Sequence, residues 1–345
     1  AGWTKDSASL LVYDRYDVWQ VFPDGRAALN LTAGHGRATQ VALRVQRTEP
    51  VEEDDDERGI DPAKPLVLRG ESEETRATGF FRTDFAAAAK KTAPQRLLWD
   101  DKNFRYIGRA QEADVLLVTA ARFDTFPDVH TTDASFGKIA RVTDGAAQQK
   151  PFLWGRGELV KFKGLGGQPL QAALYQPANF DPKKKYPMMV YIYERLAQNV
   201  HEFVAPRPSQ NVNFSLYTSH GYLVLAPDIV YQTGQPGQSA LQCVLPAVDA
   251  VVQRGCVDEN AIGIQGHSWG GYQIAYLVTQ TNRFRAAEAG APVGNMTSAY
   301  SGIRWGTGLP RQFQYEQTQS RIGQSLQAAP QLYLANSPVF RIENV

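Results

Sequence analysis

One short segment in the second half of the chain combines a serine with two glycines: Gly266-His267-Ser268-Trp269-Gly270. The spacing G-x-S-x-G is typical of a turn that lifts a nucleophilic serine above the end of a strand. Such a turn holds the serine in a strained backbone conformation, and its glycines let strand and helix cross closely. The motif therefore predicts Ser268 as a nucleophile. The alternative is that Ser268 only caps the following helix.

The segments around Ser268 are those that such a turn requires. Residues 261–265 form a short apolar run typical of a buried strand, and apolar residues recur at helical spacing after the turn. Two more apolar runs, residues 188–193 and 222–227, lack polar alternation, which indicates strands covered on both faces. Residues 239–253 have the periodicity of a helix. The pattern predicts an α/β sandwich built on a parallel sheet.

Acyl chemistry at Ser268 would need two hydrogen-bond donors for an oxyanion. The backbone N–H of Trp269 is the expected first donor, because it follows the nucleophile at the start of a helix. The second donor should come from the end of an earlier strand, and Tyr193 closes the run 188–193. Its phenol could donate a hydrogen bond there. The alternative is that Tyr193 is a packed core aromatic.

The residues that would activate Ser268 do not follow it in the chain. In α/β hydrolases the serine is followed by an acid and then a histidine, but no residue after Ser268 is Asp or His. His267 is adjacent, and neighbouring side chains on such a turn point apart. Asp181 with His201, or His201 with Asp228, would give the triad orders of other folds. The simplest expectation is that the chain stops before the strands that carry the acid and the base.

The first part of the chain has the pattern of short strands and turns. Residues 10–13 and 18–22 are β-type runs closed by a Pro-Asp-Gly turn, and a similar unit returns at residues 115–118. The distance between these units fits two repeats of roughly 50 residues, the period of propeller blades. We expect residues 1–155 to form a partial β-propeller of about three blades, with more blades upstream, and residues 156–345 to begin a catalytic domain.

Composition excludes several classes of partner and cofactor. With 36 basic and 35 acidic residues, the net charge of +1 gives no case for nucleic acid or an anionic membrane as partner. No run approaches the roughly 20 apolar residues of a membrane helix. A Gly-rich phosphate loop and a metal-binding His pair are both absent, so no cofactor is expected. The chain starts without Met and without a signal-peptide core, which leaves the compartment open.

The two cysteines and an acidic run give weaker indications of function. Cys243 and Cys256 are the only cysteines, and a helix over 239–253 would separate them beyond disulfide reach. Residues 49–57 are mostly acidic, which is typical of a solvated loop. A calcium site on Asp54 and Asp56 is the alternative, because hard cations prefer clustered carboxylates.

Two segments of the chain carry a resemblance to a known family. One runs from Trp154 to Tyr193 and includes Tyr175-Gln176-Pro177-Ala178-Asn179; the other is Gly266 to Tyr272, followed by Phe284-Arg285-Ala286-Ala287 and Ala291-Pro292-Val293. Together they resemble the catalytic domain of the prolyl oligopeptidase family of serine peptidases, closest to its dipeptidyl peptidase branch. The resemblance implies an α/β-hydrolase domain after a β-propeller, and a peptidase acting on short peptides.

The resemblance also implies roles for single residues. Tyr193 falls where the family has a tyrosine whose hydroxyl helps to bind the oxyanion. A pocket for the residue before the cut bond would be lined by Trp269, Val293, Met296, Tyr300 and Ile303. The chain departs from the family in three places. Glu194-Arg195 follows Tyr193 where a Gly-Pro turn is usual, Met296 and Ile303 replace large aromatics, and no Glu-Glu pair matches the one that binds a peptide N-terminus.

Three functions follow as hypotheses. The first is a serine peptidase in which Ser268 forms an acyl-enzyme and an acid and a base from beyond residue 345 complete the triad. The second keeps the fold but takes an ester or another small acyl substrate. The third is a non-catalytic interaction protein, since no Asp or His follows Ser268 in this chain, although Glu288, Glu316 and Glu343 do.

Overall fold

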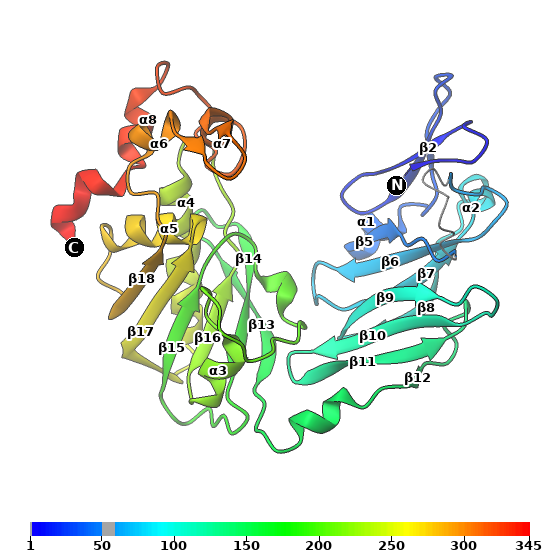
Figure 1. Cartoon of the computed structure of the whole chain (residues 1–345), viewed down its shortest axis with the longest axis horizontal. Coiled ribbons are helices and arrows are strands. Elements are labelled where there is room, and N and C mark those ends of the chain that lie inside the picture. The colour runs from blue at the N-terminus through cyan, green and yellow to red at the C-terminus, as the bar shows by residue number, and fades with distance from the viewer. Residues whose placement is uncertain (1, 50–58) are drawn as a thin grey trace. The chain divides into compact units, whose positions relative to one another are not determined.

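The structure is a computed structural model that describes residues 2–49 and 59–345. Its contacts divide the chain into two compact units, Ala1–Pro151 with His201–Phe203, and Phe152–Val200 with Val204–Val345 (Figure 1). Among the described residues no helix combines the length and apolarity needed to cross a bilayer. Most of the acidic run, with Asp54 and Asp56, lies outside the described residues. The domain boundary near residue 155 stays a prediction.

The described residues of the first unit form three four-stranded antiparallel sheets, each made of consecutive strands. The first sheet contains β1 (Gly2–Trp3), β2 (Leu10–Tyr13), β3 (Val18–Val21) and β4 (Leu29–Asn30). The second contains β5 (Val41–Val45), β6 (Leu66–Ser72), β7 (Thr78–Thr83) and β8 (Gln95–Asp100). The third contains β9 (Asn103–Arg109), β10 (Leu116–Arg122), β11 (Thr125–Thr132) and β12 (Ala140–Arg141).

Two apolar clusters hold these sheets face to face. The first joins the first and second sheets, with Leu11 and Val18 on one side and Leu43 and Leu68 on the other. The second joins the second and third sheets, where the ring of Phe80 stacks on that of Phe136 with centroids 4.5 Å apart. Alternate residues of each strand supply these contacts because successive side chains point to opposite faces.

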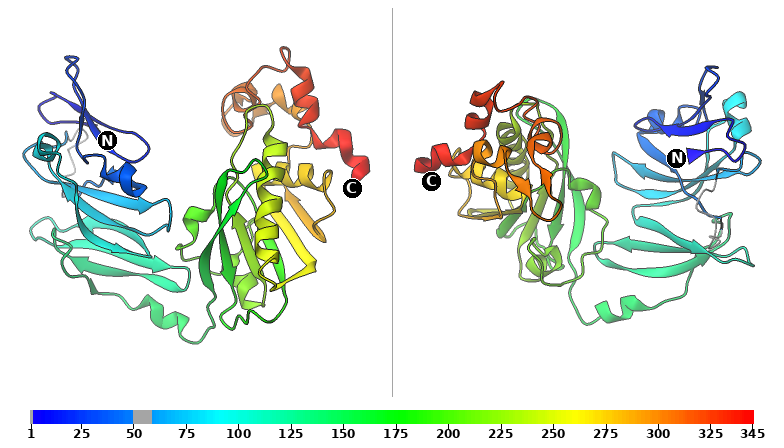
Figure 2. Two further views of the ribbon diagram at one scale, coloured as in Figure 1. Left: turned by 180° about the vertical axis from the view of Figure 1, so that it is seen from behind. Right: turned by 45° about the horizontal axis from the view of Figure 1, so that its top comes forward.

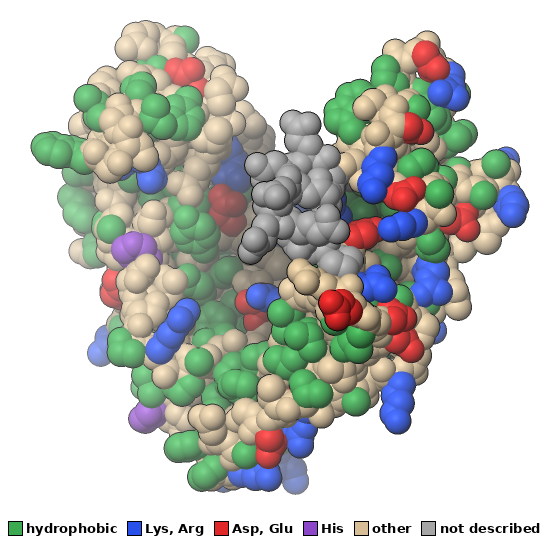
Figure 3. All heavy atoms as spheres, turned by 45° about the vertical axis from the view of Figure 1, so that its right-hand side comes forward, with side chains coloured by type: hydrophobic (Ala, Val, Ile, Leu, Met, Phe, Trp, Pro, Cys, Tyr) green, Lys and Arg blue, Asp and Glu red, His purple; other side chains and the backbone are tan. Residues whose placement is uncertain are grey.

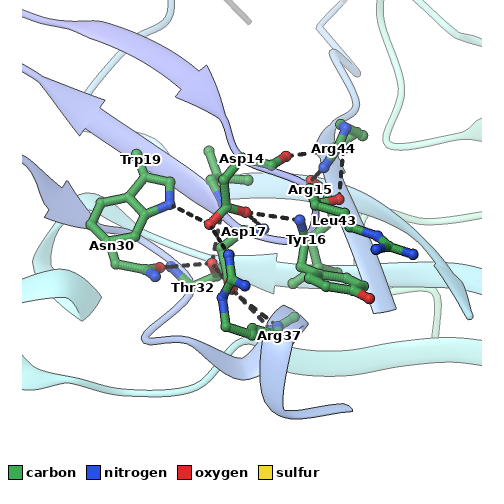
Figure 4. Close-up of polar contacts among 12 residues, drawn as sticks. Asp14, Arg15, Tyr16, Asp17, Trp19, Asn30, Thr32, Arg37, Leu43 and Arg44 are labelled. Atoms are coloured by element: carbon green, nitrogen blue, oxygen red, sulfur yellow. Dashed lines mark hydrogen bonds and ion pairs between the residues drawn. The ribbon is translucent and has the colours of Figure 1, made fainter. Parts of the chain in front are cut away.

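In the first and third sheets, a buried aspartate makes the same kind of contacts. Each accepts hydrogen bonds from a threonine hydroxyl and from backbone amides at the start of a short helix. Asp17 accepts hydrogen bonds from the Thr32 hydroxyl at 2.6 Å and from the N–H of Arg37 at 3.2 Å, at the start of α1 (His35–Thr39) (Figure 4). Asp128 accepts one from the Thr143 hydroxyl at 2.6 Å and others from amides at the start of the 3-10 helix Gly145–Gln149. These carboxylates satisfy helix N-terminal amides that otherwise lack a partner.

The second unit is built on one mixed six-stranded sheet in the order β13-β14-β16-β15-β17-β18. The hairpin of β13 (Arg156–Lys163) and β14 (Pro169–Gln176) lies at one edge and is antiparallel to its neighbours. The remaining strands run parallel: β16 (Leu223–Pro227), β15 (Tyr186–Tyr191), β17 (Val257–His267) and β18 (Ala286–Gly290).

Helices cover both faces of this sheet, which explains why its central strands are apolar without alternation. Leu223 and Leu225 of β16 belong to the large core with α4 (Pro236–Val252) and α5 (Trp269–Val278), which lie on one face (Figure 2). On the other face, Phe214 of α3 (Phe214–Ser219) contacts the rings of Tyr175 and Tyr191. The central strands of this sheet are therefore buried on both faces.

Several elements were not predicted from the sequence. Strand β18 is rich in alanine and carries Glu288, so it lacks the β-branched residues that indicate a strand. The segment after it contains the short helices α6 (Met296–Tyr300), α7 (Gln312–Glu316) and α8 (Pro330–Ala335), the two-residue strands β19 (Ile303–Arg304) and β20 (Leu309–Pro310), and the final 3-10 helix Pro338–Asn344. Such short elements carry too few turns to show a period.

Candidate active site

Ser268 lies alone between strand β17, which ends at His267, and helix α5, which begins at Trp269. Its backbone has φ 58° and ψ −112°, a left-handed conformation that is unfavourable for a residue with a Cβ atom. The serine side chain makes no capping hydrogen bond to the helix. Ser268 is half-buried, and it lies at a sharp bend rather than within a regular element.

Three glycines make this bend possible. A Cβ atom on Gly270 would lie 2.4 Å from the carbonyl oxygen of Ile192, and one on Gly266 would lie 2.8 Å from the backbone of Gly270. A Cβ atom on Gly271 would lie 2.3 Å from the carbonyl oxygen of Gly290. Since these neighbours are backbone atoms that cannot move aside, any larger residue would push the helix away from the sheet.

Trp269 begins helix α5, so its backbone N–H belongs to the first turn, where helix amides have no intrahelical partner. Its side chain is buried and stacks on Tyr272 with ring centroids 4.6 Å apart. The indole Nε1–H donates to the hydroxyl oxygen of Tyr231 at 3.0 Å. The start of the helix is thereby fixed, with its amides next to the Ser268 bend.

Tyr193 follows the end of β15 and lies beside the same bend. Its ring carbon Cδ2 is 3.6 Å from the position that a Cβ atom on Gly270 would take. The carbonyl oxygen of Tyr193 accepts hydrogen bonds from the Gln273 side-chain amide at 2.6 Å and from the Tyr231 hydroxyl at 3.1 Å. Its phenol oxygen accepts one from Nε2 of Gln319 at 3.1 Å. Tyr193 is therefore fixed at both ends while remaining half-buried.

Tyr231 connects the two sides of this site. Burial raises the pKa of its phenol well above the usual value, although the hydrogen bonds from Trp269 and Gln273 act in the opposite direction. The phenol therefore stays protonated at neutral pH, and its single proton is donated to the carbonyl oxygen of Tyr193. Tyr231 thus links the first turn of α5 to the segment that carries Tyr193.

The structure places the four pocket candidates in different surroundings. Met296 and Tyr300 are buried in the core that also contains Trp269, and the Tyr300 hydroxyl donates to a carboxylate oxygen of Glu316. Val293 is partly buried against the same core. Ile303 is 58% exposed on β19. A pocket formed by these residues with Trp269 stays a prediction.

Apolar side chains reach the surface of the segment that carries β19, β20 and the last helices. Trp305, between β19 and β20, is 97% exposed, and Leu309 and Phe313 are also exposed. Hydrophobic side chains are visible at the surface of this part of the second unit, at the upper left of Figure 3.

The structure gives each alternative triad partner another contact. Nε2 of His201 lies 3.2 Å from the carbonyl oxygen of Thr75, and burial lowers the pKa of this histidine. Oδ1 of Asp228 accepts hydrogen bonds from the amides of Leu196 and Ala197. Asp181 accepts one from an amide of its own turn. Within residues 2–49 and 59–345, none of these three side chains is hydrogen-bonded to Ser268.

Sequence reasoning missed the residues that fix Tyr193. Gln273, Tyr231 and Gln319 lie 80, 38 and 126 positions away from Tyr193 in the chain. None belongs to a motif with a fixed spacing, because their contacts depend on how distant segments fold together. The polar Gln273 within an otherwise apolar helix was the only available signal.

Comparisons with known proteins bear on the family and the fold of this chain. The model of the prolyl oligopeptidase family matches residues 208–345. Dipeptidyl-peptidase 5 from Porphyromonas gingivalis is 29% identical over 137 residues, which are 36% of this chain and 19% of that protein. The chain thus aligns with only a small part of this curated relative.

Solved structures match the whole chain. Dipeptidyl peptidase 4 from Porphyromonas gingivalis has a TM-score of 0.66 at 18% identity, covering 100% of this chain and 46% of that one. A puromycin-hydrolysing peptidase from Mycobacterium tuberculosis has a TM-score of 0.66 at 16% identity, covering 100% and 51%. These likenesses show the fold, and they confirm the predicted α/β-hydrolase domain preceded by β-propeller blades. The family match and the aligned relative show that this part of the chain is similar to the prolyl oligopeptidase family.

Proposed function

We propose that the protein that contains this chain is a serine peptidase that hydrolyses peptide bonds of short peptides, with Ser268 as the nucleophile. The observation that carries the proposal is the left-handed backbone of Ser268 between β17 and α5, at φ 58°. A protein retains such a conformation only where the surrounding structure enforces it, and these sites are often functional. The match of residues 208–345 to the prolyl oligopeptidase family and the relatives named dipeptidyl peptidases support the same reaction.

In this proposal Ser268 Oγ attacks the carbonyl carbon of the peptide while a general base takes the hydroxyl proton. The C–N bond then breaks, and the amine leaves with that proton, so an acyl-enzyme ester remains on Ser268. Water, activated by the same base, hydrolyses the ester and releases the acid. Each half of the reaction passes through a tetrahedral intermediate with a negatively charged oxygen.

The oxyanion would be held by the backbone N–H of Trp269 and the hydroxyl of Tyr193. Both groups belong to segments fixed by Tyr231 and Gln273, so they need little rearrangement when charge develops. Removing one such donor typically costs about 100-fold to 1,000-fold in kcat. The pocket for the residue before the cut bond would use Trp269, Val293, Met296, Tyr300 and Ile303.

The base and its orienting acid are proposed to come from outside the 345 residues. Support comes from the sequence, which has no Asp or His after Ser268, and from the other contacts of His201, Asp181 and Asp228. A serine without a base is a weak nucleophile at neutral pH. The 345-residue chain alone is therefore expected to be inactive.

Labelling with a fluorophosphonate probe tests the proposal. A longer form of the protein that includes downstream sequence should label at Ser268 and lose labelling in the Ser268→Ala variant, while the 345-residue chain should not label. The same longer form should hydrolyse alanyl-alanyl-4-nitroanilide. Turnover of 4-nitrophenyl acetate without any turnover of the anilide would support the esterase alternative instead. No labelling in any form would support the non-catalytic alternative.

A further inference from the structure

We propose that Gln319 is a positioning residue that reserves the hydroxyl proton of Tyr193 for the oxyanion, and that Arg321 and Glu194 hold Gln319 in place. The inference rests on the proposed function, because it assigns a role to residues that act through Tyr193. It concerns a loop that is remote in sequence from Ser268 and that carries no recognised motif. The argument starts from the number of protons that each group can donate.

A phenol has one proton to donate, and its oxygen can also accept hydrogen bonds. Nε2 of Gln319 donates to the Tyr193 hydroxyl oxygen at 3.1 Å, which occupies an acceptor position and leaves the phenol proton free. Oε1 of Gln319 is engaged on its other side, where it accepts a hydrogen bond from Nε2 of Gln314 at 3.3 Å. The Gln319 amide therefore turns its N–H toward Tyr193. A carbonyl at that place would instead capture the tyrosine proton.

Arg321 fixes the backbone that carries Gln319. Its guanidinium donates to the carbonyl oxygen of Gln319 and forms an ion pair with Oε1 of Glu194 at 3.1 Å. The same guanidinium lies 4.3 Å from the centre of the Tyr231 ring, within the range of a cation–π contact. Since Glu194 directly follows Tyr193, Arg321 ties the tyrosine segment to the glutamine segment.

Glu194 takes part in this arrangement through both its side chain and its backbone carbonyl. Arg321 and Glu194 are both about one-third exposed, at 32% and 35% of their side chains, so the pair is only partly screened by solvent. The backbone carbonyl of Glu194 also accepts a hydrogen bond from the N–H of Ile229 at 2.9 Å. The charged residue at position 194, which departs from the expected Gly-Pro turn, thus has a defined partner on the loop that positions Gln319.

The experiment uses the longer, active form of the protein and alanyl-alanyl-4-nitroanilide as substrate. Gln319→Met removes the amide at similar volume, and Gln319→Glu replaces it with a carboxylate that can only accept hydrogen bonds. Gln317→Met is the matched control, because Gln317 is exposed on the same loop. Each variant is also made in a Tyr193→Phe background, where there is no phenol proton to orient. Thermal unfolding is measured for all of them.

The expected results separate positioning from general stability. Gln319→Met should lower kcat about fivefold to tenfold with little change in KM, as befits one neutral hydrogen bond. Gln319→Glu should lower kcat as far as Tyr193→Phe does, about 100-fold or more, because the carboxylate captures the phenol proton. In the Tyr193→Phe background neither Gln319 variant should have a further effect on kcat. Gln317→Met should match the unsubstituted protein.

Other results would overturn the inference in distinguishable ways. If Tyr193→Phe lowers kcat but the Gln319 variants behave like Gln317→Met, the positioning role is wrong while the proposed function stands. If the Gln319 variants lower kcat equally in the presence and absence of the phenol, Gln319 supports only the fold. If Ser268→Ala keeps full activity, the proposed function itself fails, and the inference fails with it.

Discussion

The backbone N–H of Ser268 donates a hydrogen bond to the carbonyl oxygen of Gly290 at 2.7 Å. This bond continues the parallel pairing of β17 with β18 by one residue beyond the last paired residues, His267 and Gly290. The bend at Ser268 is therefore hydrogen-bonded to the carboxyl end of the neighbouring strand β18 and is not a free loop. Its geometry depends on the distance between the start of α5 and the end of β18.

Replacing Gly271 with alanine should disturb this distance directly. A Cβ atom there would lie 2.3 Å from the Gly290 carbonyl oxygen, which is a severe overlap with backbone. Alanine is favoured over glycine in a helix by about 1 kcal/mol, but overpacking typically costs about 1–3 kcal/mol. We expect Gly271→Ala to lower the free energy of unfolding by up to about 2 kcal/mol and to abolish fluorophosphonate labelling of the longer form.

Gly306→Ala is the control for this substitution. Nothing lies within 4 Å of the position that a Cβ atom on Gly306 would take, and its backbone has no positive φ. The control should leave the free energy of unfolding unchanged within about 0.5 kcal/mol. Urea titrations of both variants decide the matter, and equal effects would contradict the close approach of Gly271 to Gly290.

Ser268 itself should be a source of strain. At φ 58° and ψ −112° a residue with a Cβ atom costs about 1–3 kcal/mol, whereas glycine adopts positive φ freely. Ser268→Gly should therefore raise the free energy of unfolding of the 345-residue chain by about 1 kcal/mol. Ser298→Gly, in helix α6, should lower it by about 0.5 kcal/mol, because glycine weakens helices. Equal losses in both variants, measured by denaturant titration, would argue against strain at Ser268.

Asp128 should make the first unit sensitive to acid. Burial raises its pKa, but hydrogen bonds from Thr143, Gly145 and Ala146 and the charge of Arg141 outweigh burial, so the pKa lies below the usual value. A carboxylate with a lowered pKa stabilises the fold above its unfolded pKa of about 3.9, and this contribution is lost as pH falls through the folded value. Asp128→Asn should lower the free energy of unfolding by about 1–2 kcal/mol at pH 7.

The pH dependence of that loss is the measurement. The difference in unfolding free energy between the unsubstituted chain and Asp128→Asn should be constant from pH 7 to pH 5 and shrink below about pH 4. Asp24→Asn is the control, because Asp24 is exposed and its ion pair with Arg26 lies at the surface. A difference that stays constant down to pH 2 would show that the charge of Asp128 is not what stabilises the helix start.

Residues that act within one short segment were predictable from the sequence. The bend at Ser268 and its flanking strand and helix depend on local spacing, and the fold prediction is confirmed. Strand β18 was missed because its side chains are alanine, glutamate and glycine, and only its pairing with β17 makes it a strand. Local propensity decides little where pairing partners supply the stability.

The contacts that fix Tyr193 could not be predicted in the same way. A glutamine is compatible with almost any polar surface, so nothing in the sequence distinguishes Gln319 from Gln317. The distinction arises when a loop more than 120 residues away reaches the phenol, as the 126-residue separation of Gln319 and Tyr193 shows. By contrast, the sequence could have predicted that Asp128 and Thr143 repeat the contact of Asp17 and Thr32, because both pairs have the same spacing.

The reactivity of the two cysteines tests whether the core of the second unit is shielded from solvent. Cys243 in α4 and Cys256 before β17 are free and almost fully buried, and burial raises the pKa of both thiols. Since the thiolate is the reactive form, neither should react with 5,5′-dithiobis(2-nitrobenzoate) at pH 8 on the time scale of minutes. In guanidinium chloride both should react at once. Rapid reaction of one thiol in the native chain would instead show that α4 opens from the sheet.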